Sequence, residues 1–379
     1  MEILDRYINE LLDKSTPQAP VWNIEKIRQG KKSTWNYIDG CMIKAILELY
    51  LITKEEKYLN FADSFIDYFV QEDGSIQSYD PKEYNIDNVN AGKTLFDLYK
   101  LTGKEKYRKA IDTIYSQVKN QPRTASGNFW HKKIYPNQVW LDGMYMGQPF
   151  YMQYEVEYNN CENCMDSYHQ FLNVYKNLRD PKTGLYYHAF DESREMYWCD
   201  KVTGLSQNFW LRALGWYAMA LIDTMAVMPP SMEAEKAHLN EIYKDLIDSM
   251  LKYQDESGMW YQVVDKGGVE PNYLETSGTA IYAYAIMKSV RLGYLPQEYF
   301  QYGEKAFYGV CDRYLSEENG ELQLGGICLV AGLGGPARRD GTFAYYMSEP
   351  IVKNDAKGVA PLVLAYIEIL HKEKDAAQK

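Results

Sequence analysis

The chain has 379 residues, of which 46% are hydrophobic and 25% charged, and its formal net charge is −11. This balance is typical of a globular protein with a large core, and an acidic chain without a basic block excludes nucleic acid as a main partner. No apolar run approaches membrane-spanning length, and the first residues lack the basic and apolar regions of a secretory signal. We therefore expect a cytoplasmic protein without a membrane partner.

Tyrosine is abundant, with 35 copies beside 8 Trp and 12 Phe. Its apolar face and terminal hydroxyl suit hydroxylated ligands such as sugars, although much of the tyrosine must serve packing. The six cysteines are scattered, and Cys161-Glu162-Asn163-Cys164 is a lone C-x-x-C motif without a second pair. The cysteines therefore indicate neither a metal nor a redox site, and they favour a reducing compartment.

Helical periodicity dominates from the start of the chain. Met1–Ile8 begins an amphipathic helix, and apolar residues at spacings of three and four predict helices over 43–50 and 58–69, joined by a polar turn. The same two-helix unit recurs over 91–99 and 107–118. The chain therefore reads as repeated helical hairpins.

The junction between a polar segment and an apolar helix occurs six times. Each junction carries a charged residue followed by small residues in the helix, and a second, more amphipathic helix follows the first five. The charged residues are Asp39, Asp87, Asp142, Arg212, Glu275 and Asp355. An open solenoid would expose its two ends, whereas six pairs can close on themselves. We predict an all-α fold, an (α/α)6 barrel of six helical hairpins that forms one domain over residues 1–379.

If one helix of each pair faces the barrel axis, the six charged residues meet at one end and form the mouth of a pocket. The acidic residues could equally be helix N-caps, because Asp is favoured there for structural reasons. Capping does not explain Arg212, since a cation at a helix N-terminus opposes the helix dipole. We therefore favour a ligand site at this end.

Asp142 and Asp87 are the carboxylates best placed for chemistry. Asp142 lies in Trp140-Leu141-Asp142-Gly143, where a loop enters an apolar segment. A helix N-terminus lowers the pKa of a carboxyl, which is wrong for a general acid. A second carboxylate nearby and desolvation by Trp140 and Met144 would raise one pKa again, giving two carboxyls with different roles.

His131 and His188 are two of only five histidines, and both lie in loop or turn-and-strand segments. Each is open to a structural or a functional role. The chain has no cluster of His, Cys and acidic residues at metal-binding spacing, no P-loop, no dinucleotide-binding glycine fingerprint and no G-x-S-x-G elbow. We expect neither a metal nor an organic cofactor.

Basic and aromatic residues near the junctions suit an anionic sugar. Lys132 and Arg338 give the mouth a basic element, and an arginine can hold an anionic group through two hydrogen bonds. Trp140, Trp216 and Tyr345 could stack on sugar faces, or they could fill the core.

Two groups of motifs form a recognisable combination. The first is Trp130-His131…Tyr135-Pro136…Gln138…Trp140-Leu141-Asp142-Gly143…Met146…Pro149-Phe150, and the second is Arg339-Asp340-Gly341-Thr342-Phe343…Tyr345-Tyr346…Ser348-Glu349-Pro350…Asn354-Asp355…Lys357-Gly358-Val359. With Asp87 and Trp210-Leu211-Arg212…Gly215-Trp216 they span essentially the whole chain. The combination resembles glycoside hydrolase family 105, the unsaturated rhamnogalacturonyl hydrolases and their relatives.

The resemblance implies an (α/α)6 barrel that removes a 4,5-unsaturated uronic acid from the non-reducing end of a small, lyase-generated oligosaccharide, without a cofactor. It implies that Asp142 is the general acid/base and that Asp87 binds the sugar and tunes Asp142. His188, Arg212 and Trp216 match substrate-contacting positions, and His131 lies in the motif loop. From their places in the sequence we add Trp140, Lys132, Tyr345 and Arg338 to the candidate binding residues, with Arg212 ahead of Arg338 for the carboxylate.

Other functions remain open at this point. The linked sugar could differ from rhamnose, as in a glucuronyl-type substrate. A sugar epimerase or isomerase on the same barrel would need paired histidines at the axis, which the loop positions of His131 and His188 do not favour. A protein that binds carbohydrate without turning it over is the third alternative.

Overall fold

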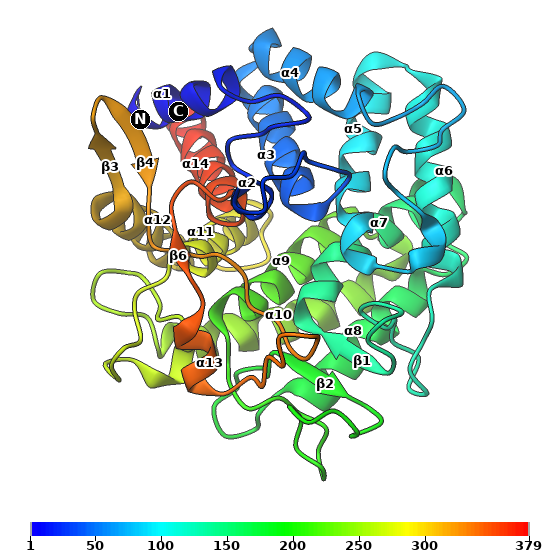
Figure 1. Ribbon diagram of the computed structural model, residues 1–379, viewed down its shortest axis with the longest axis vertical. Helices are drawn as coiled ribbons and strands as arrows, with labels where there is room; N and C mark the ends of the chain where they lie inside the picture. Colours follow the sequence, from blue (N-terminus) through cyan, green and yellow to red (C-terminus); the bar gives the residue numbers. More distant parts are fainter. Residues whose placement is uncertain (1, 378–379) are drawn as a thin grey trace.

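The computed structural model describes residues 2–377, so Met1, placed by the sequence in the first helix, lies outside the described residues. Six helical segments form an inner ring (Figure 1). They are α3 (Tyr37–Thr53), η2 continued by α5 (Ile86–Gly92 and Lys93–Thr102), α7 (Leu141–Tyr158), α9 (Leu211–Val227), α11 (Thr276–Arg291) and α14 (Ala356–Ala377).

Contacts between neighbouring helices close this ring. In chain order, α3 packs on η2, η2 on α7, α7 on α9, α9 on α11 and α11 on α14, and α14 returns to α3. The predicted (α/α)6 barrel is therefore confirmed.

The outer helices follow the inner ones in the chain. They are α4 (Glu56–Asp67), α6 (Glu105–Asn120), α8 (Cys164–Leu178), α10 (Glu233–Leu251) and α12 (Phe300–Tyr314). The inner helices α9 and α11 are buried over almost their whole lengths, as expected of helices apolar on every side, whereas α4 and α6 bury one face only.

The sixth inner helix, α14, also has an outer partner. The N-terminal helix α1 (Glu2–Asp13) lies against α14, where the Tyr366 hydroxyl donates to Asp5 Oδ1 at 3.0 Å. Tyr7 of α1 also donates to Asn354, just before α14, at 2.7 Å. The beginning of the chain therefore supplies the outer partner of its last helix.

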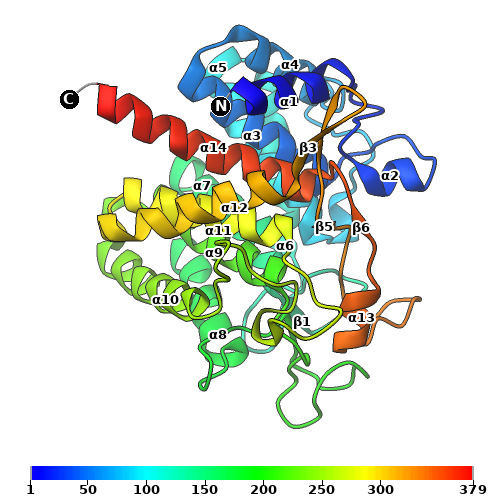
Figure 2. The same ribbon diagram turned by 90° about the vertical axis from the view of Figure 1, so that its left-hand side faces the viewer.

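Short helices and strands lie at the end of the barrel where the inner helices begin. Figure 2 shows β1, β5, β6, α2 and α13 gathered on one side of the helices and the C-terminal end of α14 on the other. The antiparallel pairs are β1 (Gln138–Trp140) with β2 (Ala189–Asp191), β3 (Leu315–Glu318) with β4 (Glu321–Leu324), and β5 (Ile327–Cys328) with β6 (Ile351–Val352). The remaining short helices are α2 (Ile24–Arg28), α13 (Phe343–Ser348), η1 (Pro81–Glu83), η3 (Pro230–Met232), η4 (Val264–Lys266) and η5 (Gln297–Tyr299).

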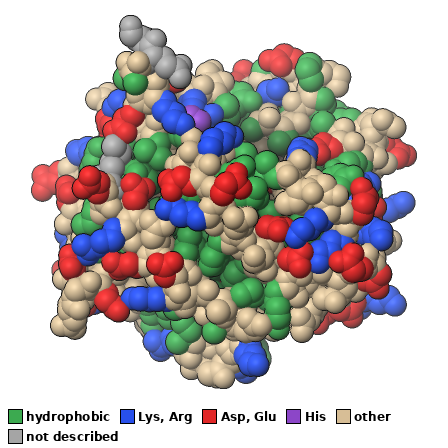
Figure 3. All heavy atoms as spheres, turned by 90° about the horizontal axis from the view of Figure 1, so that it is seen from above, with side chains coloured by type: hydrophobic (Ala, Val, Ile, Leu, Met, Phe, Trp, Pro, Cys, Tyr) green, Lys and Arg blue, Asp and Glu red, His purple; other side chains and the backbone are tan. Residues whose placement is uncertain are grey.

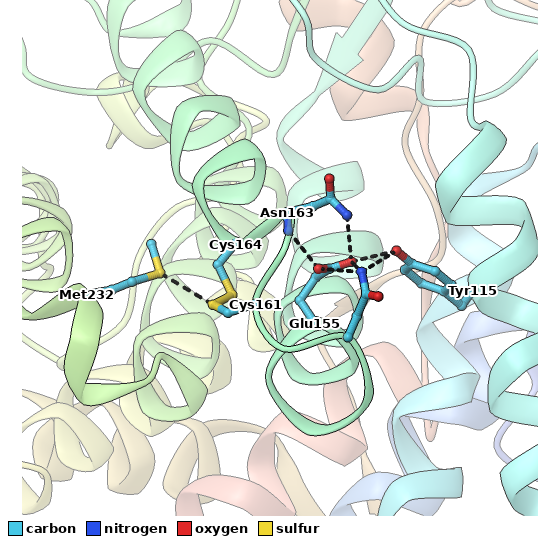
Figure 4. The surroundings of a disulfide bond; sticks show 7 residues. Tyr115, Glu155, Cys161, Asn163, Cys164 and Met232 are labelled. Carbon is cyan, nitrogen blue, oxygen red and sulfur yellow. Dashed lines mark hydrogen bonds between the residues drawn. A yellow bond between two sulfur atoms is a disulfide. The ribbon is translucent and has the colours of Figure 1, made fainter.

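Cys161 and Cys164 form a disulfide in the turn between α7 and α8 (Figure 4). The sequence had indicated no redox role for this pair, because it is a lone C-x-x-C motif without a second pair; the turn nevertheless brings the two cysteines together. Here their Cα atoms lie 5.0 Å apart, within the usual range for a disulfide. The buried Glu155 carboxylate fixes the turn by accepting from Tyr115 Oη at 2.6 Å and from the Asn163 backbone N–H at 2.7 Å.

The face of the molecule seen from above is charged but of mixed sign. Seen from above, Lys and Arg side chains are interspersed with Asp and Glu (Figure 3). Ion pairs such as Lys104 Nζ with Asp63 Oδ2, at 2.7 Å, link outer helices to one another. Among the described residues, no helix is both long and apolar enough to cross a membrane.

Small residues allow the inner segments to approach closely. A Cβ added at Gly40 of α3 would lie 2.6 Å from the Cα of Ala91 in η2, so Gly40→Ala should force the two segments apart. We expect a loss of about 1–3 kcal/mol of stability, the usual cost of overpacking. The control is Gly325→Ala, whose Cβ would meet Tyr314 at 3.6 Å, an ordinary contact. Urea denaturation followed by circular dichroism measures both; equal midpoints would contradict the close approach.

Candidate active site

Asp142 is not a helix cap. Trp140 occupies the N-cap position of α7 and Trp210 that of α9, and neither helix has a side-chain cap. Instead, the Leu141 N–H donates to the His188 carbonyl at 3.1 Å. By contrast, Glu275 caps α11 by accepting from the N–H groups of Ser277 and Gly278. The Asp142 side chain is therefore not committed to its own helix.

Asp142 faces His188. The strand pair β1–β2 aligns Trp140 with Ala189, which sets His188 beside the start of α7. Asp142 Oδ2 lies 3.2 Å from His188 Nε2, and the histidine side chain is fully buried. The two atoms are at ion-pair distance, yet neither has a hydrogen-bond partner of good geometry among the described residues. Because these two buried atoms lack such hydrogen bonds, they are free to bond to a ligand.

Tyr346 orients the imidazole. Its hydroxyl lies 2.7 Å from His188 Nδ1, and both side chains are fully buried. Trp210 lies against both rings, with its centroid 4.8 Å from that of His188 and 6.1 Å from that of Tyr346. This packing aims His188 Nε2 at Asp142.

Asp87 is held as an anion by Lys132. The Lys132 ammonium lies 2.7 Å from Asp87 Oδ2, and His131 Nε2 lies 3.4 Å from Oδ1. Burial raises the pKa of Asp87, but the Lys132 ammonium outweighs it, so that the pKa lies below its usual value. An isolated bridge between Asn85 and Lys132 brings the lysine to this place. Two sequence-predicted carboxylates therefore have different partners, one a histidine and the other a lysine.

His131 packs beneath this group as a neutral side chain. Burial lowers its pKa to about 4, and the nearby Asp87 only partly opposes this effect. Its ring is parallel to that of Trp140, with centroids 4.6 Å apart. Gly143 is needed here, because an added Cβ would lie 2.8 Å from His131 Nδ1.

The two tryptophans predicted to stack on sugar are packed against protein rings. Trp140 is 6% exposed and lies parallel to Tyr135 as well as to His131. Trp216 is 2% exposed and stacks on Tyr145 at 5.0 Å. Tyr145 follows Asp142 by one turn and Trp216 follows Arg212 by one turn, so this pair forms the floor beneath the site.

The predicted arginines differ in position. Arg212 is buried and donates to Ser277 Oγ and to the carbonyls of Cys328 and Leu329, which engages three of its five N–H donors. Arg338 is exposed and lies over the Tyr197 ring at 4.8 Å. Its neighbour Arg339 turns inward and donates to Tyr135 Oη at 3.3 Å. Sequence position alone did not distinguish these adjacent arginines.

The adjacent tyrosines are separated in the same way. Tyr345, the sequence-predicted binding residue, donates to Glu349 at 2.6 Å and accepts from the Gly332 N–H. Tyr346, which was not selected, is the one that reaches His188. The Thr342 side chain caps α13, and this sets which tyrosine faces inward. In the sequence, the threonine four residues before Tyr346 was the sign that a short helix begins here.

An open cavity of about 320 Å³ adjoins Asp87 and Lys132. Its other walls come from the α2 region, from Trp35, Asn36 and Tyr37 ahead of and in α3, and from Asn85 and Asn88 around η2. Amide, aromatic and charged groups around one cavity suit a hydroxylated ligand. Among the described residues, no group of three or more His, Cys, Asp and Glu side chains could hold a metal ion.

Comparison with known proteins agrees with this arrangement. The family model for Glycosyl Hydrolase Family 88 matches residues 9–372. The chain belongs to this family. Its structure is similar to that of a C. acetobutylicum glycoside hydrolase from family 105, with a TM-score of 0.89 and 44% identity over 97% of this chain and 98% of the other. The resemblance to family 105 is thereby confirmed. Membership of family 88 makes this protein a glycoside hydrolase.

Two further relatives extend the comparison. The chain is 29% identical to the unsaturated rhamnogalacturonyl hydrolase YesR of Bacillus subtilis over 297 residues, which is 76% of this chain and 78% of YesR. It shares its fold with the unsaturated glucuronyl hydrolase of Bacillus sp. GL1, with a TM-score of 0.64 and 15% identity over 89% of this chain and 87% of the other. At that identity only the fold is informative.

The buried His131 should make stability depend on pH. Its folded-state pKa of about 4 lies below the ordinary 6.5. Between these two pH values the unfolded chain binds a proton on this histidine and the folded protein does not. Stability from this group is therefore present above pH 6.5 and lost as the pH falls toward 4, by roughly 3 kcal/mol at most. Replacing His131 with Gln should flatten this part of the stability profile, measured by urea unfolding at several pH values. The exposed His238→Gln is the control; identical slopes for both variants would contradict the assignment.

Proposed function

We propose that this family 88 hydrolase removes a 4,5-unsaturated uronic acid from the non-reducing end of an oligosaccharide by hydrating the C4=C5 double bond. The observation that carries the proposal is the Asp142 carboxyl, whose side chain is 14% exposed at the uncapped start of α7 and whose Oδ2 lies 3.2 Å from His188 Nε2. A group that must both give and take a proton needs such freedom from structural hydrogen bonds.

In the first step, the Asp142 carboxyl donates its proton to C4 of the vinyl ether. Positive charge then develops at C5 and on the ring oxygen, next to the anions of Asp142 and Asp87, which stabilise it. Water adds at C5 and gives a proton to the Asp142 carboxylate, which restores the acid. The resulting hemiketal opens and releases the linked sugar.

The other side chains divide the remaining tasks. Asp87, fixed as an anion by Lys132, accepts hydrogen bonds from sugar hydroxyls and adds negative potential near Asp142. His188, held by Tyr346, positions the Asp142 carboxyl and the attacking water. Bond formation occurs at C4 and C5 rather than at the anomeric carbon, so the separation of Asp142 and Asp87 does not have to match that of an ordinary glycosidase.

The substrate carboxylate requires a cation. Arg212 keeps two N–H donors after its three protein contacts, and Arg339 donates to Tyr135 Oη. We assign the carboxylate to Arg212 first. The cavity beside Asp87 accepts the linked sugar, and similarity to YesR favours a rhamnogalacturonan-type disaccharide over a glucuronyl-type one. In this account the whole chain acts as one catalytic domain.

Asp142→Asn should abolish turnover. An amide cannot donate the proton to C4, so kcat should fall by at least about 10²–10⁴-fold, the usual contribution of a general acid. The assay is the loss of ultraviolet absorbance of the conjugated double bond in unsaturated pectin disaccharides. Asp265→Asn, in η4, is the control and should retain activity. Near-normal turnover by the Asp142→Asn variant would contradict the proposal.

The two adjacent tyrosines offer a sharper test of positioning. Tyr346→Phe removes the hydrogen bond to His188 Nδ1 and should lower kcat about tenfold with little change in KM. Tyr345→Phe removes a bond to Glu349 instead and should leave kcat nearly unchanged. The reverse ranking would contradict the proposed role of Tyr346.

The second sugar can be identified with a panel of unsaturated disaccharides. We expect the rhamnose-linked disaccharide to give the highest kcat/KM and the glucuronyl-type substrates a lower value. Chromatography of the products also distinguishes hydrolysis from epimerisation, because only hydrolysis separates the two sugars. A product that keeps both sugars joined would favour the epimerase.

A further inference from the structure

The first residues of three neighbouring inner segments, η2, α7 and α9, are held in the same way. Each donates its backbone N–H to the carbonyl of a residue in the loop that follows the outer helix of the same hairpin. The pairs, donor first, are Ile86 with His131 at 3.1 Å, Leu141 with His188 at 3.1 Å, and Leu211 with Gln262 at 3.0 Å. One backbone arrangement therefore repeats at three consecutive junctions of the barrel.

At the first two junctions, the accepting residue also places its side chain beside the charged residue that comes second in the inner segment. His131 Nε2 lies 3.4 Å from Asp87 Oδ1. His188 Nε2 lies 3.2 Å from Asp142 Oδ2. The position of the accepting residue is therefore one from which a side chain reaches the candidate active site.

Gln262 occupies this position at the third junction, where the charged residue is Arg212. Cys328 contacts both residues. Arg212 Nη1 donates to its carbonyl, and the Gln262 amide lies beside its thiol, whose pKa burial raises to about 11 while the guanidinium and this amide oppose the rise. The Arg212 guanidinium lies 4.7 Å from the centroid of the Trp210 ring, which packs on His188. Gln262 is therefore a neighbour of the cation assigned to the substrate carboxylate.

The Gln262 side chain lacks hydrogen-bond partners among the described residues. It is fully buried, and neither its Nε2 nor its Oε1 has a partner. Gln148 shows the ordinary state of a buried glutamine, since its Nε2 donates to Gln170 Oε1 at 3.0 Å and its Oε1 accepts from Ser167 Oγ at 2.7 Å. Unsatisfied buried polar atoms destabilise a folded protein, and they are uncommon in native structures. The Gln262 amide is therefore available to a ligand, as are the unpartnered atoms of the neighbouring junction.

We propose that Gln262 is a substrate-binding residue, whose Nε2 donates a hydrogen bond to the carboxylate of the unsaturated uronic acid beside Arg212. This assignment rests on the proposed function. Arg212 has two N–H donors left, so that the guanidinium and the amide together can serve both carboxylate oxygens. A carboxylate has no hydrogen to donate, which leaves Oε1 to accept from a hydroxyl of water or of the sugar.

Recognition of the carboxylate is measured by the ratio of kcat/KM for an unsaturated disaccharide to that for its methyl ester. Gln262→Met removes the hydrogen bond at similar side-chain size and should lower this ratio at least about tenfold, the usual effect of losing a hydrogen bond to a charged group. Gln262→Glu sets a negative charge against the carboxylate and should lower the ratio further. The loss of ultraviolet absorbance of the double bond follows both substrates.

Stability provides a readout that does not involve the substrate. Because the Gln262 side chain makes no hydrogen bond in the free protein, Gln262→Met should leave the urea midpoint unchanged or raise it. The matched control is Gln148→Met, which breaks two hydrogen bonds between α7 and α8. This control should lower the midpoint and keep the acid-to-ester ratio of the unmodified protein.

The outcomes separate this assignment from the proposed function. If the unmodified protein consumes the acid and Gln262→Met leaves the ratio unchanged, the assignment of Gln262 is overturned and the proposed function stands. A midpoint that falls as far in Gln262→Met as in Gln148→Met would show a structural role and would also overturn the assignment. If the unmodified protein consumes neither substrate, the proposed function fails, and the assignment fails with it.

Discussion

Closure of the ring by α14 against α3 is the constraint on which the rest of the molecule depends. A closed ring of six hairpins sends the first turns of all inner segments to one end and their last turns to the other. The polar loops and strand pairs then gather at the first end, while the axis below is filled by Tyr145 stacked on Trp216.

At the open end, environment distinguishes two carboxyls that look alike in the sequence. Asp87 has a lysine at 2.7 Å, which holds it as an anion. Asp142 has a histidine, and that histidine is fixed from behind by Tyr346 and Trp210. One carboxyl is therefore paired with a lysine ammonium, while the other faces an imidazole. This division suits a site in which a single group must donate and recover a proton.

The sequence was informative where periodicity and spacing determine structure. The six junctions predicted the barrel and placed Asp142 and Asp87 at one end, because helix period and hairpin repeat are local properties. It was uninformative where a loop decides which of two neighbours points inward. Arg338 and Arg339 differ in how their backbone is turned, and Arg338 has a φ of 48°. The outer partner of α14 likewise depends on a contact between distant segments, since α1 comes from the other end of the described chain.

The most direct test of the central claim is the fate of C4 during the reaction, followed by proton NMR of the early products in heavy water. Hydration initiated by Asp142 predicts that the vinyl proton signal at C4 disappears as the linked sugar is released, and that C4 carries a new deuterium. Release of a uronic acid that still has its C4=C5 double bond would show attack at the anomeric carbon, and it would contradict the account.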